Sequence, residues 1–124
     1  MGGNAKYLER ALVLASCSEH SNFKHGAVLV KGGKVLSEGS NKYTNTGKMH
    51  GFGSIHAEEC ALRGIKKDPR GGVMYIARLA SYGPAMSKPC YRCQLILKNA
   101  GIKRVVYTSG NGGMEDMYLC QAIQ

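Results

Sequence analysis

The 124-residue sequence lacks long apolar runs, internal repeats and low-complexity tracts, and it has few acidic residues. No apolar run approaches the roughly 20 residues that a membrane-spanning helix needs, so no such helix is expected. The first seven residues lack the apolar core of a secretory signal peptide, which favours a soluble, cytoplasmic protein. Five cysteines, an odd number, fit poorly with a fully paired secreted disulfide framework. The length and the 44% apolar content predict a single folded domain over residues 1–124.

Acidic side chains number 8 against 17 Lys and Arg, which gives a formal net charge of +9. The imbalance is greatest between Cys60 and Arg104, where ten basic residues accompany a single acid, Asp68. A basic surface of this kind attracts phosphate, in a nucleotide or in a polynucleotide. Basic residues also serve simply to keep a surface soluble. Charge alone therefore leaves both interpretations open.

The spacing of apolar residues predicts alternating helices and strands. Helices are expected over residues 6–18, 55–67, 89–100 and 114–123. Strands are expected over residues 27–30, 35–37, 73–79 and 105–108. Gly32-Gly33 suits the turn of a hairpin between the first two strands. Ser54 is the expected N-cap of the second helix, and Pro89 fits the first turn of the third.

This order of elements predicts a three-layer α/β fold with a mixed sheet of four or five strands flanked by helices. An antiparallel hairpin is expected at one end of the sheet, followed by strand–helix–strand crossovers. Ligands of such open sheets bind near the carboxyl ends of strands and the N-termini of helices. The segments 39–55 and 80–88 have no periodicity and are expected to be irregular, and a loop as long as 39–55 is often functional.

Cys90 and Cys93 lie three residues apart at the start of a predicted helix, and therefore on one of its faces. The free N–H groups of a first helical turn favour thiolates, the form of cysteine that binds metal. A Cys-x-x-Cys pair also occurs in thioredoxin-like redox sites, in structural zinc half-sites and as two core thiols. The pair by itself does not distinguish these.

His56 is the histidine that begins a predicted helix next to a carboxylate. A closed structural zinc site needs four protein ligands, and the chain has neither a second Cys-x-x-Cys nor a histidine pair at zinc-finger spacing. One His and two Cys leave the fourth tetrahedral position for water, as in a catalytic zinc site. Glu58, two positions after His56, is close enough to act on that water. A Glu in a first helical turn more commonly complements the helix dipole, and Glu59 directly follows.

His56-Ala57-Glu58 together with Pro89-Cys90-x-x-Cys93 resembles the zinc signature of the cytidine and deoxycytidylate deaminase superfamily, H-x-E followed by P-C-x-x-C. The resemblance extends to residues 25–30, to Gly39-x-Asn41 and to residues 100–105. It covers roughly residues 7–108, most of the chain.

The resemblance implies a cytidine-deaminase-like fold and zinc-dependent hydrolysis of a cytosine base to uracil. It implies one Zn²⁺ per chain, held by His56, Cys90 and Cys93 with water or hydroxide as the fourth ligand. Glu58 would then carry protons without binding the metal. Asn41, Ala57 and Ser87 are the candidate substrate-binding residues, although Asn41 also suits a turn and Ser87 a loop cap.

The family branches suggest a cytosine-containing nucleotide such as dCMP as the substrate. Adenosine deaminases of tRNA usually carry Glu where this chain has Lys88, and free-nucleoside cytidine deaminases usually carry Gly at the position of Tyr91. Deoxycytidylate deaminases often bind a second zinc through the insertion before the His motif. That insertion offers His50 but no cysteine here, so no second metal is expected.

A cytidine deaminase of single-stranded DNA or RNA is the main alternative. The net charge and Ser87 would suit a single strand that runs past the site. The same holds for the basic and aromatic residues of one loop, which are Lys42, Tyr43, Lys48 and Phe52. A non-catalytic zinc module that binds nucleic acid is a further alternative. The family pattern also suggests a homo-oligomer. The 17 residues after Tyr107 have room for a helix and little more, so the sequence does not decide whether the sheet has a fifth strand.

Overall fold

The computed structural model describes residues 2–18, 24–43 and 54–119. Its helices are α1 (Gly2–Ser16), α2 (Ala57–Arg63) and α3 (Tyr91–Asn99). Its strands are β1 (Lys24–Lys31), β2 (Lys34–Ser40), β3 (Lys42–Tyr43), β4 (Ser54–Ile55), β5 (Val73–Ala80), β6 (Gly83–Ala85), β7 (Arg104–Thr108) and β8 (Met114–Tyr118). None of the described helices is long and apolar enough to cross a membrane.

The main sheet is mixed and has the strand order β2-β1-β5-β7-β8, with β6 paired to β5. β1 is antiparallel to both β2 and β5, β5 and β7 are parallel, and β8 is antiparallel to β7. β3 and β4 form a separate antiparallel pair. The predicted mixed α/β fold is confirmed, although the main sheet has six strands where four or five were expected.

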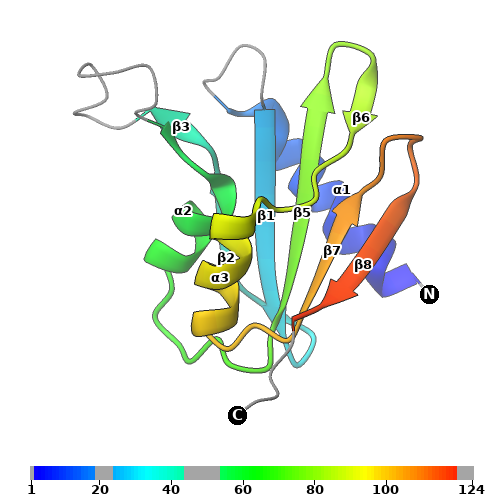
Figure 1. The fold of residues 1–124 in the computed structure, drawn as a ribbon. Coiled ribbons are helices and arrows are strands. Elements are labelled where there is room, and N and C mark those ends of the chain that lie inside the picture. Colours follow the sequence, from blue (N-terminus) through cyan, green and yellow to red (C-terminus); the bar gives the residue numbers. More distant parts are fainter. Residues whose placement is uncertain (1, 19–23, 44–53, 120–124) are drawn as a thin grey trace.

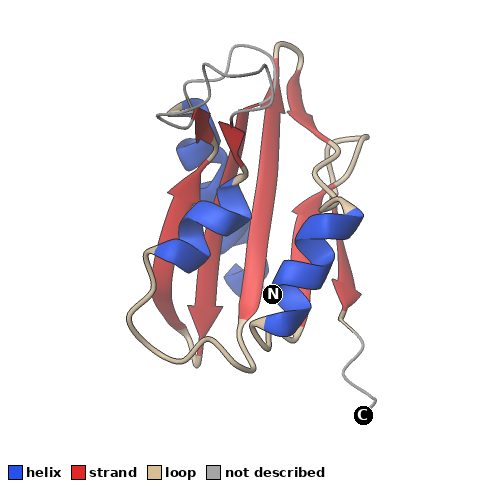
Figure 2. Cartoon of the chain, turned by 60° about the vertical axis from the view of Figure 1, so that its left-hand side comes forward, coloured by secondary structure: helices blue, strands red, loops and turns tan. Residues whose placement is uncertain are grey.

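Helices cover both faces of the sheet and make it the middle of three layers (Figure 1). α1 packs on one face, and α2 and α3 pack on the other; Figure 2 shows helices lying against the long strands. Side chains of β1 alternate between the two sides: Ala27 and Leu29 enter the core beneath α2 and α3, whereas Val28 and Val30 enter the core beneath α1. This double burial explains why the strand reads as a continuous apolar run.

Glycines at two points determine how the chain turns and packs. The predicted hairpin between β1 and β2 turns at Gly32 and Gly33, whose φ angles are +60° and +78°. Positive φ at both turn positions is typical of the type I′ hairpin turn. Gly39 on β2 lies against α2, because a Cβ there would come within 2.6 Å of the Ala61 backbone nitrogen. The missing side chain lets α2 lie directly on the strand.

The C-terminal region differs from the sequence-based expectation. Residues 114–118 form strand β8 and not the start of a helix, so the fifth strand left open above is present; residues 120–124 lie outside the described part. The connection from β7 turns back at Gly112, with φ of +88°, and the Ser109 N–H donates to the Gly113 carbonyl. Such a short link allows an antiparallel return but not a crossover helix. Arg104 on β7 then pairs with Asp116 on β8 at 2.8 Å.

The second and third helices both begin later than predicted. Ser54 does not cap α2, because Ser54 and Ile55 form β4 opposite β3. α2 therefore has His56 as its N-cap, and it ends at Arg63, four residues earlier than expected. Pro89 precedes the N-cap of α3, which is Cys90. Within the segment 80–88, expected to be irregular, β6 pairs with the end of β5.

Replacing Gly39 with Ala is expected to lower the free energy of unfolding by about 1–3 kcal/mol, the usual cost of overpacking. The added Cβ would meet the backbone of α2, which cannot move without disturbing the helix. Urea denaturation measures the change. Gly110→Ala is the control, because a Cβ there meets nothing within 4 Å. Equal stability of the two variants would contradict the close packing of α2 on β2.

Candidate active site and metal centre

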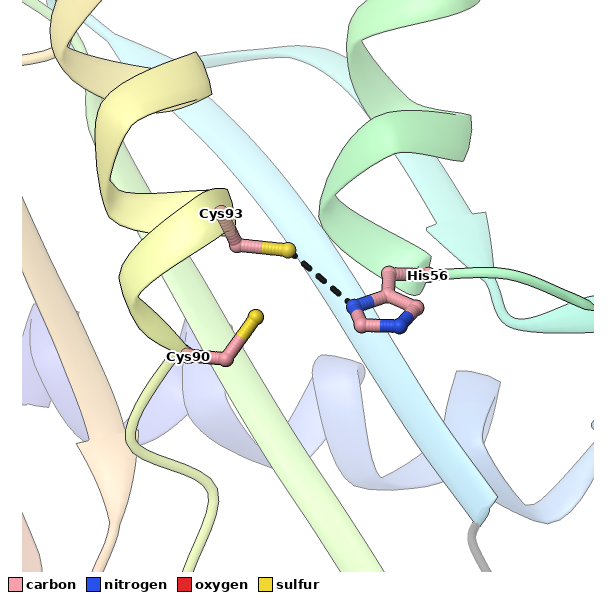
Figure 3. A group of neighbouring side chains, drawn as sticks. All are labelled: His56, Cys90 and Cys93. Carbon is pink, nitrogen blue, oxygen red and sulfur yellow. Dashed lines mark hydrogen bonds between the residues drawn. The ribbon is translucent and has the colours of Figure 1, made fainter. Parts of the chain in front are cut away.

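The side chains of His56, Cys90 and Cys93 meet in space, although the histidine and the cysteines are far apart in the sequence. Their ligand atoms all lie within 4.8 Å of one another. His56 Nδ1 stands 3.1 Å from Cys93 Sγ. Figure 3 shows the three side chains pointing toward one another from the starts of α2 and α3. The structure therefore brings together the three predicted metal ligands.

Both helices begin at one of the predicted ligands. His56 is the N-cap of α2 and Cys90 is the N-cap of α3, and neither side chain makes a capping hydrogen bond to its own helix. Serine, threonine, aspartate and asparagine are the usual N-cap residues. Here the N-cap side chains are directed at each other instead. Two helix N-termini, with their partial positive charge, face the same place and favour thiolates there.

The three donors suit zinc in their chemistry and spacing. Around a tetrahedral zinc, with Zn–S of about 2.3 Å and Zn–N of about 2.0 Å, the donors stand roughly 3.5–3.8 Å apart. The separations in the structure bracket that range. Cys93 is buried, whereas His56 and Cys90 are exposed, so the group is open to solvent on one side. An open site with three protein donors is typical of catalytic rather than structural zinc.

Glu58 is buried beside this group, with 4% of its surface exposed. Burial raises the pKa of the Glu58 carboxyl, a rise that its own backbone N–H and His56 oppose. Burial also raises the pKa of the Cys93 thiol, and the charge of Glu58 raises it further. Burial thus disfavours ionisation of both groups, and a nearby cation would favour it.

The structure separates the two neighbouring glutamates. Glu58 is buried, whereas the carboxylate of Glu59 binds Arg92 of α3 through two hydrogen bonds of 3.0 and 3.2 Å. Glu59 is therefore engaged in an ion pair, whereas the salt bridges among the described residues do not include Glu58, and a proton-transfer role for Glu58 stays a prediction. Sequence reasoning missed Arg92; the signal was a basic residue inside the Cys-x-x-Cys motif with an acid three positions after His56.

The proposed substrate residues all lie in the interior. Ala57 is fully buried in the first turn of α2. The side-chain oxygen of Asn41 accepts hydrogen bonds from the Ser18 hydroxyl and from the His25 backbone N–H, at 2.6 and 2.9 Å. These bonds fix the end of β2 to the start of β1. Contact of either residue with a substrate stays a prediction.

Ser87 holds the segment that leads to Cys90. Its buried hydroxyl lies 2.9 Å from the Ile76 carbonyl and accepts a hydrogen bond of 2.8 Å from the Thr108 backbone N–H. The Thr108 hydroxyl in turn donates to the Ala85 carbonyl. Thr108, which the sequence did not single out, thus connects β7 to β6 and to the segment that leads to Cys90. A substrate contact of Ser87 stays a prediction, as do contacts of residues 44–53, which lie outside the described part.

The family model for the cytidine and deoxycytidylate deaminase zinc-binding region matches residues 1–109. The chain belongs to the cytidine and deoxycytidylate deaminase family. Members of this family are deaminases, and deaminases are hydrolases, so this deaminase is a hydrolase with a zinc-binding region. The sequence-based assignment to the superfamily is confirmed. Comparison with curated proteins gave no match.

Solved structures share the fold of this deaminase. The dCMP deaminase of cyanophage S-TIM5 has a TM-score of 0.70 at 23% identity, with 86% of this chain and 82% of that chain covered. The cytidine deaminase of Burkholderia pseudomallei has a TM-score of 0.68 at 22% identity, with 93% and 91% covered. A structure from studies of tRNA:A34 deaminases has a TM-score of 0.58 at 26% identity, with 88% and 80% covered.

The deaminase is expected to contain close to one zinc per chain, and Cys90→Ala is expected to weaken zinc binding more than about 100-fold. Loss of a ligand should exceed the 10–100-fold effect of losing an outer-shell partner. Elemental analysis and chelator competition measure both quantities. Cys17→Ala is the control, because Cys17 is a free, exposed cysteine outside the ligand group. Full zinc retention in Cys90→Ala would remove Cys90 from the site.

Proposed function

We propose that this deaminase hydrolyses the amino group of a cytosine base to give uracil, on a cytidine or deoxycytidine nucleotide such as dCMP. The observation that carries the proposal is the buried carboxylate of Glu58 beside the His56, Cys90 and Cys93 donors. The net charge of +9 suits a phosphate-bearing substrate. The cyanophage dCMP deaminase of the same fold has been solved in complex with dCMP and dUMP, which supports a nucleotide for this chain.

His56, Cys90 and Cys93 would hold one zinc ion. When bound, zinc supplies a polarised water whose pKa falls toward 7 and which is therefore a nucleophile near neutral pH. Two thiolates and a neutral imidazole balance the charge of the ion.

Glu58 transfers the protons of the reaction as a general base and then a general acid. Its carboxylate takes a proton from the attacking water and delivers it to ring nitrogen N3, next to the carbon under attack. It then passes the second proton of the water to the departing amino group, so that cytosine and water yield uracil and ammonia. Burial supports this role, because it raises the pKa of the carboxyl toward the range in which a group both accepts and releases protons.

Glu58→Gln is expected to lower the rate of ammonia release from dCMP by about 10²–10⁴-fold, the usual contribution of general acid–base catalysis. The amide keeps the shape of the side chain but cannot carry the proton. Zinc content should stay near that of the unchanged protein. Glu9→Gln, at an exposed position on α1, is the control. Activity that survives Glu58→Gln would refute Glu58 as the proton carrier.

A single-stranded polynucleotide is the second candidate substrate, and exposed aromatic rings favour it. Tyr91 directly follows Cys90 and is 75% exposed, and Tyr82 in the β5–β6 turn is also 75% exposed. Such rings stack on bases along a strand, and nearby cations such as Lys88 suit the phosphates. Because the family consists of deaminases, an enzyme is favoured over the non-catalytic module that only binds nucleic acid.

Tyr91→Ala separates the two substrates. If the chain acts on polynucleotides, the variant should lose about 5–100-fold in activity on a short cytosine-bearing single strand, the value of one stacked base, with little change on dCMP. Tyr118→Ala, an exposed tyrosine on β8, is the control. Ammonia release from dCMP and none from the single strand would exclude the second candidate.

A further inference from the structure

An ion pair joins the two helices that carry the metal donors. The guanidinium of Arg92 on α3 donates to both carboxylate oxygens of Glu59 on α2, at 3.0 and 3.2 Å. The side chain of Glu59 is largely buried, with 14% exposed, while that of Arg92 is 64% exposed. Among the described residues, this is the one salt bridge between α2 and α3.

The pair lies in the same helical turns as the donors. Glu59 is three residues after His56, and Arg92 lies between Cys90 and Cys93. Both partners therefore stand in the first turn of a helix that also presents one or two donor atoms. A change in the distance between Glu59 and Arg92 changes the distance between the histidine and the cysteines.

These helix starts lack the usual means of fixing an N-terminus. Neither His56 nor Cys90 caps its own helix. The helices are short, with seven residues in α2 and nine in α3. On the core side, α2 contributes the small side chains of Ala57 and Ala61. A two-bond ion pair across the gap restrains both position and rotation, which a single contact between point charges does not.

We propose that Glu59 and Arg92 are positioning residues of the metal centre: their paired hydrogen bonds set the separation of the two helix starts and hold the three donors at metal-binding distance before the ion arrives. This inference rests on the proposed function of His56, Cys90 and Cys93 as metal ligands. The competing interpretation is an ordinary ion pair near the surface, which adds slightly to stability and has no effect on the metal.

Metal affinity tests the proposal without reference to catalysis. Zinc affinity is measured by chelator competition. Binding of Co²⁺ is followed through its thiolate charge-transfer and d–d absorption, which report donor geometry. Glu59→Gln and Arg92→Lys are each expected to bind both metals about three- to tenfold more weakly, with altered d–d bands. Lysine keeps the charge but cannot form the two parallel bonds, so an effect of Arg92→Lys identifies geometry rather than charge.

The double variant Glu59→Gln/Arg92→Lys should bind no more weakly than either single variant, because each change already breaks the same contact. The Arg10–Glu38 pair supplies the matched control. It is also a two-bond pair, at 2.7 and 2.9 Å, but it joins α1 to β2. Glu38→Gln should change the melting temperature about as much as Glu59→Gln does, while metal affinity stays within twofold of the unchanged protein.

Unchanged metal affinity and unchanged Co²⁺ spectra in both Glu59→Gln and Arg92→Lys would overturn the positioning role. That result would leave the assignment of His56, Cys90 and Cys93 as metal ligands unaffected. An unchanged protein that binds neither Zn²⁺ nor Co²⁺ would overturn the metal centre itself. Arg92 is mostly exposed, so Arg92→Lys remains informative even if Glu59→Gln does not fold.

Discussion

One imidazole nitrogen and two cysteine sulfurs meet where two helices begin, and the rest of the structure is arranged around that meeting. Donor atoms within 4.8 Å of one another bring the starts of α2 and α3 together. Burial raises the pKa of both Glu58 and Cys93, and the charge of Glu58 raises the pKa of Cys93 further, so negative charge is unfavourable at this place unless a cation offsets it. The cost of that arrangement is the signature of a functional site rather than of a stable core.

The scaffold supplies the precision that such a site needs. The sheet is buried on both faces, and α2 lies directly on β2 because Gly39 has no side chain. Ser87 and Thr108 bind the segment before Cys90 to β5 and β7 through buried hydrogen bonds. These contacts attach α2 and the segment before α3 to the sheet, and the Glu59–Arg92 ion pair joins the two helix starts.

The site was more predictable from the sequence than the boundaries of its helices. The spacing of His56, Glu58, Cys90 and Cys93 identified the metal group, because chemistry of this kind restricts residue types closely. The same residues made the helix starts hard to find. Capping rules favoured Ser54, but Ser54 pairs in β4, and the N-caps are the predicted ligands His56 and Cys90. The helix predicted for the C-terminal segment was wrong for another reason. Met114 and Met117 fit helical spacing, and only the pairing of that segment with β7 decides for a strand.

The account depends most directly on which atoms bind the metal. X-ray absorption at the zinc edge of the purified protein reports that set directly. The account predicts about two sulfur neighbours at roughly 2.3 Å and two nitrogen or oxygen neighbours at roughly 2.0–2.1 Å. A shell of four sulfurs, a shell with none, or a protein that purifies and reloads without zinc would contradict it.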